Sequence, residues 1–96
     1  MSFKIISSGT FVRQAAKLDK KSKRVVKEKI ELIKANPFRF KRIHSKHFNK
    51  VFRIRLNLQG KESRLIYVVL EPNIILACLF ERKKGYRDLK KYLSKI

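Results

Sequence analysis

Hydrophobic positions in the first third of the chain recur with a helical period. Over residues 10–18 and again over residues 22–35, apolar side chains return every three or four positions: Phe11, Ala15 and Leu18, then Val26, Ile30 and Ile33. The basic turn at residues 19–21 separates the two segments, and Asn36-Pro37 ends the second, because the residue before a proline disfavours the helical region. The pattern predicts a hairpin of two amphipathic helices.

The second half of the chain has the period of strands. Phe52, Ile54, Leu56 and Leu58 alternate with polar residues over 51–58, which is typical of a half-buried strand. The turn at residues 59–62 leads to a second strand at 64–70, and the turn at 71–73 leads to an apolar third strand at 74–80. Two tight connections predict an antiparallel meander, and the third strand is expected to be central.

Shorter segments complete the expected fold. Residues 4–6 are expected to form a short opening strand, and residues 38–50 show no period and are expected to be a loop. A terminal helix is indicated by the stripe of Tyr86, Leu89, Tyr92 or Leu93, and Ile96. The order strand-helix-helix-strand-strand-strand-helix predicts one α+β domain spanning residues 1–96. Its N-terminal strand and helical hairpin should pack on a small twisted antiparallel sheet, and all its helices are expected on one face of that sheet.

Charge adds the first indication of function. The 96 residues carry 26 Lys and Arg against 7 Asp and Glu, a formal charge of +19, which favours a polyanionic partner. A single cysteine excludes a disulfide framework and a cysteine-based zinc site. No apolar run is long enough for a signal peptide or a membrane span, so we expect a cytoplasmic protein without a membrane partner.

The basic residues are concentrated where the meander is expected. Residues 39–64 hold nine Lys and Arg and one acid, Glu62, whereas a solvated face usually mixes both signs. Arg53 and Arg55 project from the same side of their strand, Arg64 opens the next strand, and residues 82–84 follow the third. The alternative is an ordinary solvated strand face, but the pattern favours a phosphate-binding surface.

Other chemistry has less support in the sequence. The acids are dispersed and not spaced for two-metal chemistry, so no metal or other cofactor is expected. His44 and His47 are either a general acid and base or polar loop residues, and Cys78 belongs to the core. Clustered Arg and Lys could support metal-free RNA cleavage, because fixed positive charge stabilises a pentacoordinate phosphorane, and a lysine crowded by cations could serve as the base.

The strands also resemble a known family. Val51-Phe-Arg-Ile-Arg-Leu56, Ser63-Arg-Leu-Ile-Tyr-Val68 and Glu81-Arg-Lys-Lys-Gly-Tyr86 are similar to the strands and basic C-terminal segment of the RelE/ParE toxin superfamily. The resemblance implies a type II toxin–antitoxin toxin of the RelE branch. Such a toxin is a metal-independent endoribonuclease that cleaves mRNA in the ribosomal A site by 2′-hydroxyl attack. The implied partners are mRNA, ribosomal RNA and an acidic or amphipathic antitoxin, in a hetero-oligomer.

The resemblance also implies roles for particular residues. Arg53 and Arg55 match the two basic residues of the family's first meander strand, and Arg64 matches the arginine that contacts the scissile phosphate. Arg82 or Lys84 matches the proposed general acid, and Tyr86 matches the tyrosine that stacks on the mRNA base, with Tyr92 as its rival. The wider RNA-binding set is basic and flanks these positions: Lys46, His47, Lys50, Lys83 and Lys84.

One departure from the family leaves the catalytic base open. Where the RelE pattern has lysines on the first meander strand, this chain has arginines, whose high pKa makes them poor bases. Two other readings remain: a non-nucleolytic ParE-type toxin acting on DNA gyrase, and a plain RNA- or ribosome-binding protein. The ParE-type toxin lacks the basic catalytic residues, so the presence of Arg53, Arg55, Arg64 and Arg82 counts against it. A plain RNA-binding protein would need only the positive charge.

Overall fold

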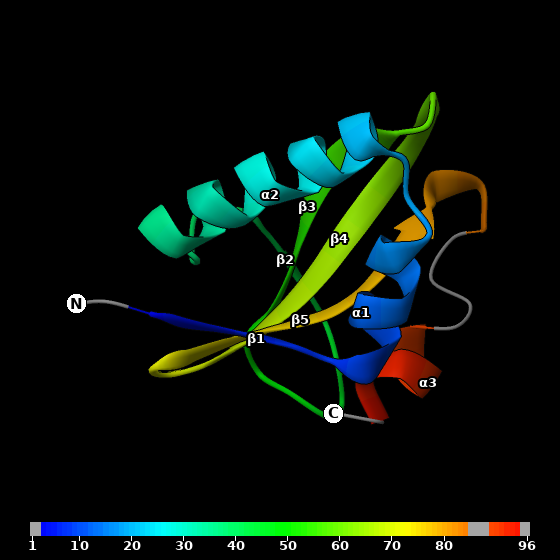
Figure 1. Cartoon of the computed structure of the whole chain (residues 1–96). Helices are drawn as coiled ribbons and strands as arrows, with labels where there is room; N and C mark the ends of the chain where they lie inside the picture. The colour runs from blue at the N-terminus through cyan, green and yellow to red at the C-terminus, as the bar shows by residue number, and fades with distance from the viewer. Residues whose placement is uncertain (1–2, 85–88, 95–96) are drawn as a thin grey trace.

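The computed structural model describes residues 3–84 and 89–94, and it contains one sheet with helices on both sides. The elements are β1 (Lys4–Ser7), α1 (Gly9–Ala16), α2 (Lys20–Ala35), β2 (Lys41–Ile43), β3 (Val51–Leu58), β4 (Lys61–Leu70), β5 (Asn73–Glu81), the 3-10 helix η1 (Arg82–Lys84) and α3 (Leu89–Ser94). Figure 1 follows them from the blue β1 to the red α3. The predicted α+β class is confirmed.

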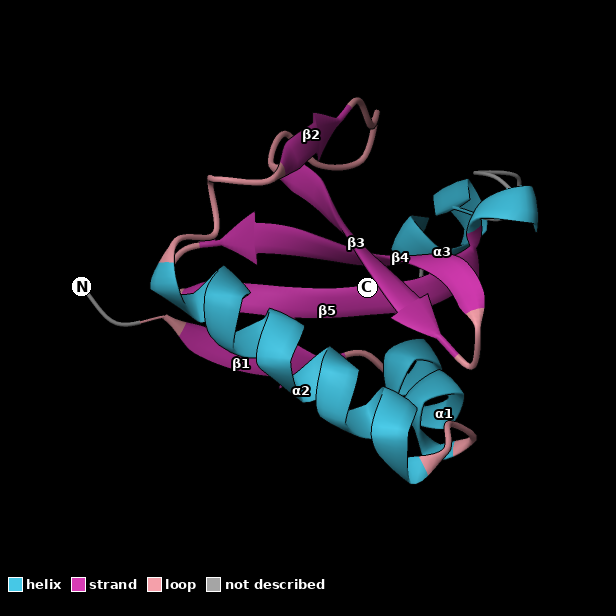
Figure 2. Ribbon diagram, turned by 90° about the horizontal axis from the view of Figure 1, so that it is seen from above, coloured by secondary structure: helices cyan, strands magenta, loops and turns pink. Residues whose placement is uncertain are grey.

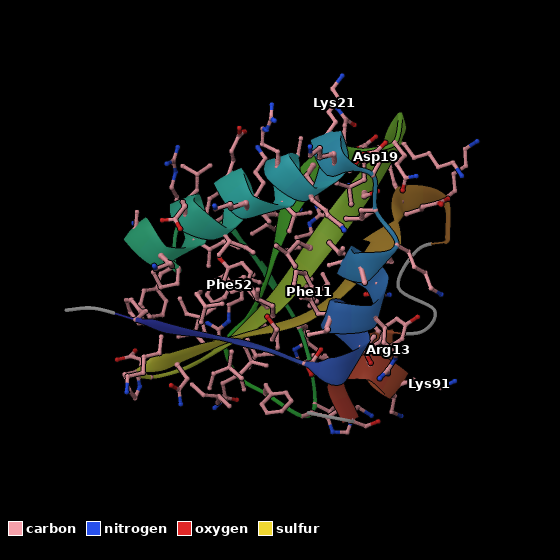
Figure 3. The ribbon with its side chains drawn as sticks, in the orientation of Figure 1. Phe11, Arg13, Asp19, Lys21, Phe52 and Lys91 are labelled. Carbon is pink, nitrogen blue, oxygen red and sulfur yellow. The ribbon has the colours of Figure 1, made fainter. Side chains whose placement is uncertain are left out.

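Both helices of the hairpin begin at capping side chains. The Ser8 hydroxyl accepts a hydrogen bond from the Phe11 amide at 3.0 Å at the start of α1. At the start of α2, Asp19 accepts from the Ser22 amide at 2.7 Å. These bonds satisfy amides that have no partner inside a helix, and the bond from the Ser22 amide lowers the pKa of the Asp19 carboxyl. The basic turn between the helices therefore contains the cap of the second one, and Figure 3 shows Asp19 there with Lys21 pointing outward.

The meander pairs as the alternation predicts. β3 and β4 are antiparallel and are joined by Gln59 and Gly60, which both have positive φ, 52° and 77°. Such a two-residue turn matches the twist of the paired strands. β4 is antiparallel to β5 in turn, with a shift in register after Ile66 that leaves Ala77 as the extra residue of β5.

The sheet is mixed rather than antiparallel throughout, which corrects the sequence prediction. The strand order is β1-β5-β4-β3-β2, and β1 pairs in parallel with β5, where Ile5 lies opposite Ile74. β4 is therefore the central strand. The third strand of the meander, β5, which was expected to be central, lies between β4 and β1. The segment 38–50, expected to be a loop, contains the short edge strand β2, which pairs with β3.

The sheet has a hydrophobic layer on each side. α1 and α2 cover one face, where Phe11, Ile33, Phe52 and Leu65 pack together, and Figure 2 shows α2 crossing over the strands. Figure 3 shows Phe11 and Phe52 between the helices and the sheet. On the opposite face α3 places Leu89 and Leu93 against Val51, Ile66, Val68 and Cys78. The expectation that all helices share one face is therefore wrong for α3.

No helix in the described ranges is long and apolar enough to cross a membrane.

Candidate nucleic-acid interface

The three arginines of the meander lie on the face of the sheet opposite α1 and α2. Phe52 and Ile54 of β3 point into the helix-covered core, so Arg53 and Arg55 project from the other side. In the β3–β4 register Arg55 lies directly opposite Arg64, and Arg53 lies opposite Ile66. Side chains directly opposite each other in antiparallel strands share a face, so the structure brings these arginines together as the alternation predicted.

Arg64 differs from its neighbours because it is buried. Its side chain is only 5% exposed, whereas Arg55 is exposed and Arg53 is half-buried. The Arg64 guanidinium donates through Nη1 to Glu62 Oε1 at 3.3 Å. Burial of a charged group is costly unless it is paired, so this contact contributes to holding Arg64 in place. The sequence prediction of an exposed basic surface is therefore wrong at Arg64.

Glu62 joins Arg64 to the segment that follows β5. Its second oxygen, Oε2, accepts from Arg82 Nη1 at 3.1 Å, so one carboxylate bridges two guanidinium groups. Hydrogen bonds from Arg82, the larger cause, and from Arg64 lower the pKa of the Glu62 carboxyl. The side chain remains ionised at neutral pH and holds two predicted site residues from β4 and η1 together.

A lysine that sequence reasoning missed also belongs to this surface. Lys41 of β2 lies directly opposite Arg53 in the β2–β3 register and is exposed. It lines an open depression of about 550 Å³ together with Arg53, Arg55 and two cationic side chains of the helix-hairpin side, Lys29 and Arg39. The only signal for Lys41 was its place in an aperiodic basic segment, which gave no reason to pair it with β3.

This arrangement can bind phosphate but offers little for other chemistry. Guanidinium groups bind phosphate oxygens in a bidentate geometry and stay charged at every accessible pH. Within the described residues no three side chains of the metal-binding types gather to form a metal site. Cys78 is fully buried, and burial raises the pKa of its thiol to about 12, so it belongs to the core.

The similarity of this chain to known proteins is found in its fold and not in its sequence. No family model and no curated protein sequence matches the chain. Among solved structures, an arginine-to-alanine double mutant of the E. coli toxin RelE in the free state is similar at a TM-score of 0.70. The likeness covers 99% of this chain and 94% of that chain at 15% identity. The chain has the RelE fold.

A second similar structure is the intact E. coli RelBE toxin–antitoxin complex, with a TM-score of 0.65 and 16% identity. That likeness covers 84% of this chain and 96% of the matched chain. Both likenesses extend over most of this chain and of the matched chain. The resemblance to the superfamily predicted from the strands is thereby confirmed for the fold.

The remaining predicted residues occupy three places on the RelE fold. Lys46 and His47 line a depression of about 200 Å³ against Leu89 and Leu93 of α3, on the same side of the sheet as the arginines. His44 lines it too, and the His47 amide donates to the Ser45 hydroxyl at 3.1 Å. This second depression places the two histidines beside α3.

Lys50 is not part of the arginine surface. Its carbonyl accepts from the Val69 amide at 2.9 Å, and its ammonium group contacts Glu71 at 3.3 Å. It also lies 5.5 Å from the centre of the Phe38 ring, on the side of the sheet that α1 and α2 cover. Lys50 therefore lies apart from the arginine surface that it was expected to flank.

The basic C-terminal segment is described only in part. Lys83 is exposed in η1 beside Arg82, and Lys84 ends that helix. Tyr86 lies outside the described residues. Its rival Tyr92 is partly buried and packs against the hydrophobic cluster under α3.

Proposed function

We propose that this protein is the toxin of a type II toxin–antitoxin system and an endoribonuclease that cleaves mRNA on the ribosome. The RelE fold supports the first part, and the arginine surface supports the second. The observation that carries the proposal is the gathering of three arginines from β3, β4 and η1: Arg55 lies opposite Arg64 on one face of the sheet, and Arg64 and Arg82 contact the same carboxylate, that of Glu62. Positive charge of this density on one face suits a phosphate of the RNA backbone.

The reaction is an attack of the ribose 2′-oxygen on the adjacent phosphorus. A base removes the 2′-hydroxyl proton, the new bond from O2′ to phosphorus forms, and the bond from phosphorus to O5′ breaks as O5′ receives a proton. The products are a 2′,3′-cyclic phosphate and a 5′-hydroxyl, and no oxidant or water enters. Arg64 and Arg55 stabilise the charge that develops on the phosphorane oxygens, and Arg82 or Lys84 is the proposed donor of the proton to the leaving oxygen.

The base is the least defined part of this mechanism. Arginine stays protonated at neutral pH and is a poor base, so Arg53 and Arg55 serve to bind and stabilise. Lys41 is the lysine placed opposite Arg53 on the same face, and this position makes it the first candidate among the described lysines. Tyr86 keeps its proposed role in stacking on the mRNA base.

The proposed partners follow from the charge. A protein of charge +19 is attracted over long range to ribosomal RNA and to an acidic antitoxin, and the similar RelBE structure is a complex of a toxin with its antitoxin. A toxin–antitoxin hetero-oligomer in the cytoplasm is therefore the expected resting form.

The test is cleavage of mRNA on programmed ribosomes, with mapping of the cut ends. We expect cuts in the A site that leave a 2′,3′-cyclic phosphate, and no cut where the attacking ribose is 2′-deoxy. Arg55→Gln should slow cleavage by about 10²–10³-fold, the usual effect of removing one electrostatic donor. Arg24→Gln is the matched control, because it removes the same charge from the exposed surface of α2.

Two results would overturn the proposal. RNA binding without any cut would leave a plain RNA-binding protein. An equal loss of rate in Arg24→Gln and Arg55→Gln would mean that net charge, rather than the arginine surface, accounts for activity.

A further inference from the structure

Glu62 lies at the centre of the proposed phosphate site. It is the one acid among residues 39–64, and its two oxygens contact Arg64 at 3.3 Å and Arg82 at 3.1 Å. The β3–β4 register places it opposite Asn57, on the same face as Arg55 and Arg64. A negative charge in this position opposes the binding of another anion, so the presence of an acid among these arginines requires an explanation.

The geometry of the bridge is that of a bound anion. A carboxylate and a phosphate both present paired oxygens to guanidinium groups, and the two groups compete for the same donors. The Arg64 side chain is only 5% exposed, so little of its guanidinium group faces solvent. A phosphate that reaches Arg64 and Arg82 together therefore meets the Glu62 carboxylate between them.

We propose that the Glu62 carboxylate is an internal substitute for the RNA phosphate: it keeps Arg64 and Arg82 together in the free protein, and the phosphate displaces it. This inference rests on the proposed function for the identity of the displacing anion. Glu62 is therefore a positioning residue that lowers the affinity of the free protein for RNA and leaves both arginines arranged for a phosphate.

The surroundings of Glu62 allow the carboxylate to leave. Its side chain is 40% exposed and that of Arg82 is 66% exposed, so both side chains border solvent into which they can rotate. Arg64 stays fixed because it is buried. The exchange needs a change of side-chain rotamer and no movement of the sheet.

The test measures binding of a 2′-O-methyl RNA oligonucleotide, which cannot be cleaved, by fluorescence anisotropy at fixed ionic strength. The variants are Glu62→Gln and the matched control Glu81→Gln. Glu81 also forms an exposed ion pair, with Lys61 at 3.4 Å, but the register places it opposite Ser63, on the other face of the sheet. Both variants raise the net charge equally, so a difference between them reports the position of the carboxylate.

We expect Glu62→Gln to tighten binding about threefold to tenfold more than Glu81→Gln does, the range set by releasing two ion pairs of which one is partly buried. In an Arg82→Gln background, this additional effect should become smaller, because half of the bridge is already gone.

Equal tightening by the two variants would overturn the inference, since net charge would then explain both. Weaker binding by Glu62→Gln would overturn it as well, because the carboxylate would then only organise the arginines. The assay does not depend on cleavage, so tightening by Glu62→Gln in a protein that cuts no mRNA would refute the proposed enzymatic function and leave this inference standing.

Discussion

The Tyr67 hydroxyl ties the connection after α2 to the middle of the sheet. Tyr67 is fully buried, its hydroxyl donates to the Pro37 carbonyl at 2.6 Å, and its ring stacks on Phe52 with centroids 5.5 Å apart. Tyr67→Phe removes the hydroxyl and keeps the ring. The change therefore isolates one buried hydrogen bond between residues 30 positions apart in sequence.

The expected cost follows from the group left behind. Without the hydroxyl, the carbonyl of the buried Pro37 loses its hydrogen-bond donor. A buried acceptor without a partner lowers the free energy of unfolding by about 1–3 kcal/mol. The ring contact with Phe52 is unchanged, so we expect the free energy of unfolding to fall by about 1–2 kcal/mol. For a domain of this size each kcal/mol lowers Tm by roughly 4–8 °C.

The assay is urea and thermal unfolding, with RNA cleavage measured well below the transition. Because Tyr67 faces α2, on the side away from the arginines, cleavage at low temperature should not change. Burial raises the pKa of Tyr67, so the hydroxyl contributes its full stability below the unfolded pKa of about 10 and loses it only as the pH rises further. The difference between the two proteins should therefore be constant from neutral pH to about pH 9.

Two outcomes would refute this reasoning. An unchanged Tm would show that the bond contributes no net stability, and a loss of cleavage at full stability would show that the two faces of the sheet are coupled. Tyr67→Leu is the reference for loss of the ring, and it should cost more than Tyr67→Phe.

Three substitutions and one labelling experiment test the site and the scaffold further. Arg64→Lys keeps the charge but loses the planar fork, so cleavage on ribosomes should slow by about tenfold or more, and a wild-type rate would show that the fork is not used. Lys41→Gln should slow cleavage by about 10²-fold or more if Lys41 is the base, whereas Lys27→Gln on the exposed side of α2 should not slow it. Asp19→Asn should reduce the fall of Tm below about pH 4, because the lowered pKa of this carboxyl confers stability that is lost as the pH drops through it. Cys78 should resist thiol reagents until the protein unfolds, and labelling at the rate of an open thiol would contradict its burial.

The local pattern of the meander predicted the arginine surface well. Alternation along 51–58 determines which residues of that strand share a face, and tight turns determine which strand comes next. Arg53, Arg55 and Arg64 were placed on the correct face for these reasons, but the burial of Arg64 was not predicted. Both capped helices were also predicted, since their apolar spacing is local.

Pairing between distant segments was beyond local patterns. The parallel pairing of Ile5 with Ile74 joins residues from opposite ends of the chain, and no period reports it. A strand as short as β2 has too few positions to show alternation, so Lys41 was missed. The stripe of Leu89 and Leu93 shows that α3 buries one side, but it carries no information about which face of the sheet receives it.

The pairing of β1 with β5 has a consequence for the order in which the protein folds. The meander joins neighbours in sequence and can form early, whereas β1 must wait for residues 73–76 before it has a partner. The ion pair between Glu62 and Arg82 also needs η1, which is synthesised after β5. A nascent chain therefore lacks both the pairing of β1 with β5 and the complete arginine cluster until Arg82 has been synthesised. For the proposed function, this order keeps the chain harmless to the ribosome that makes it until residues 73–82 have been added.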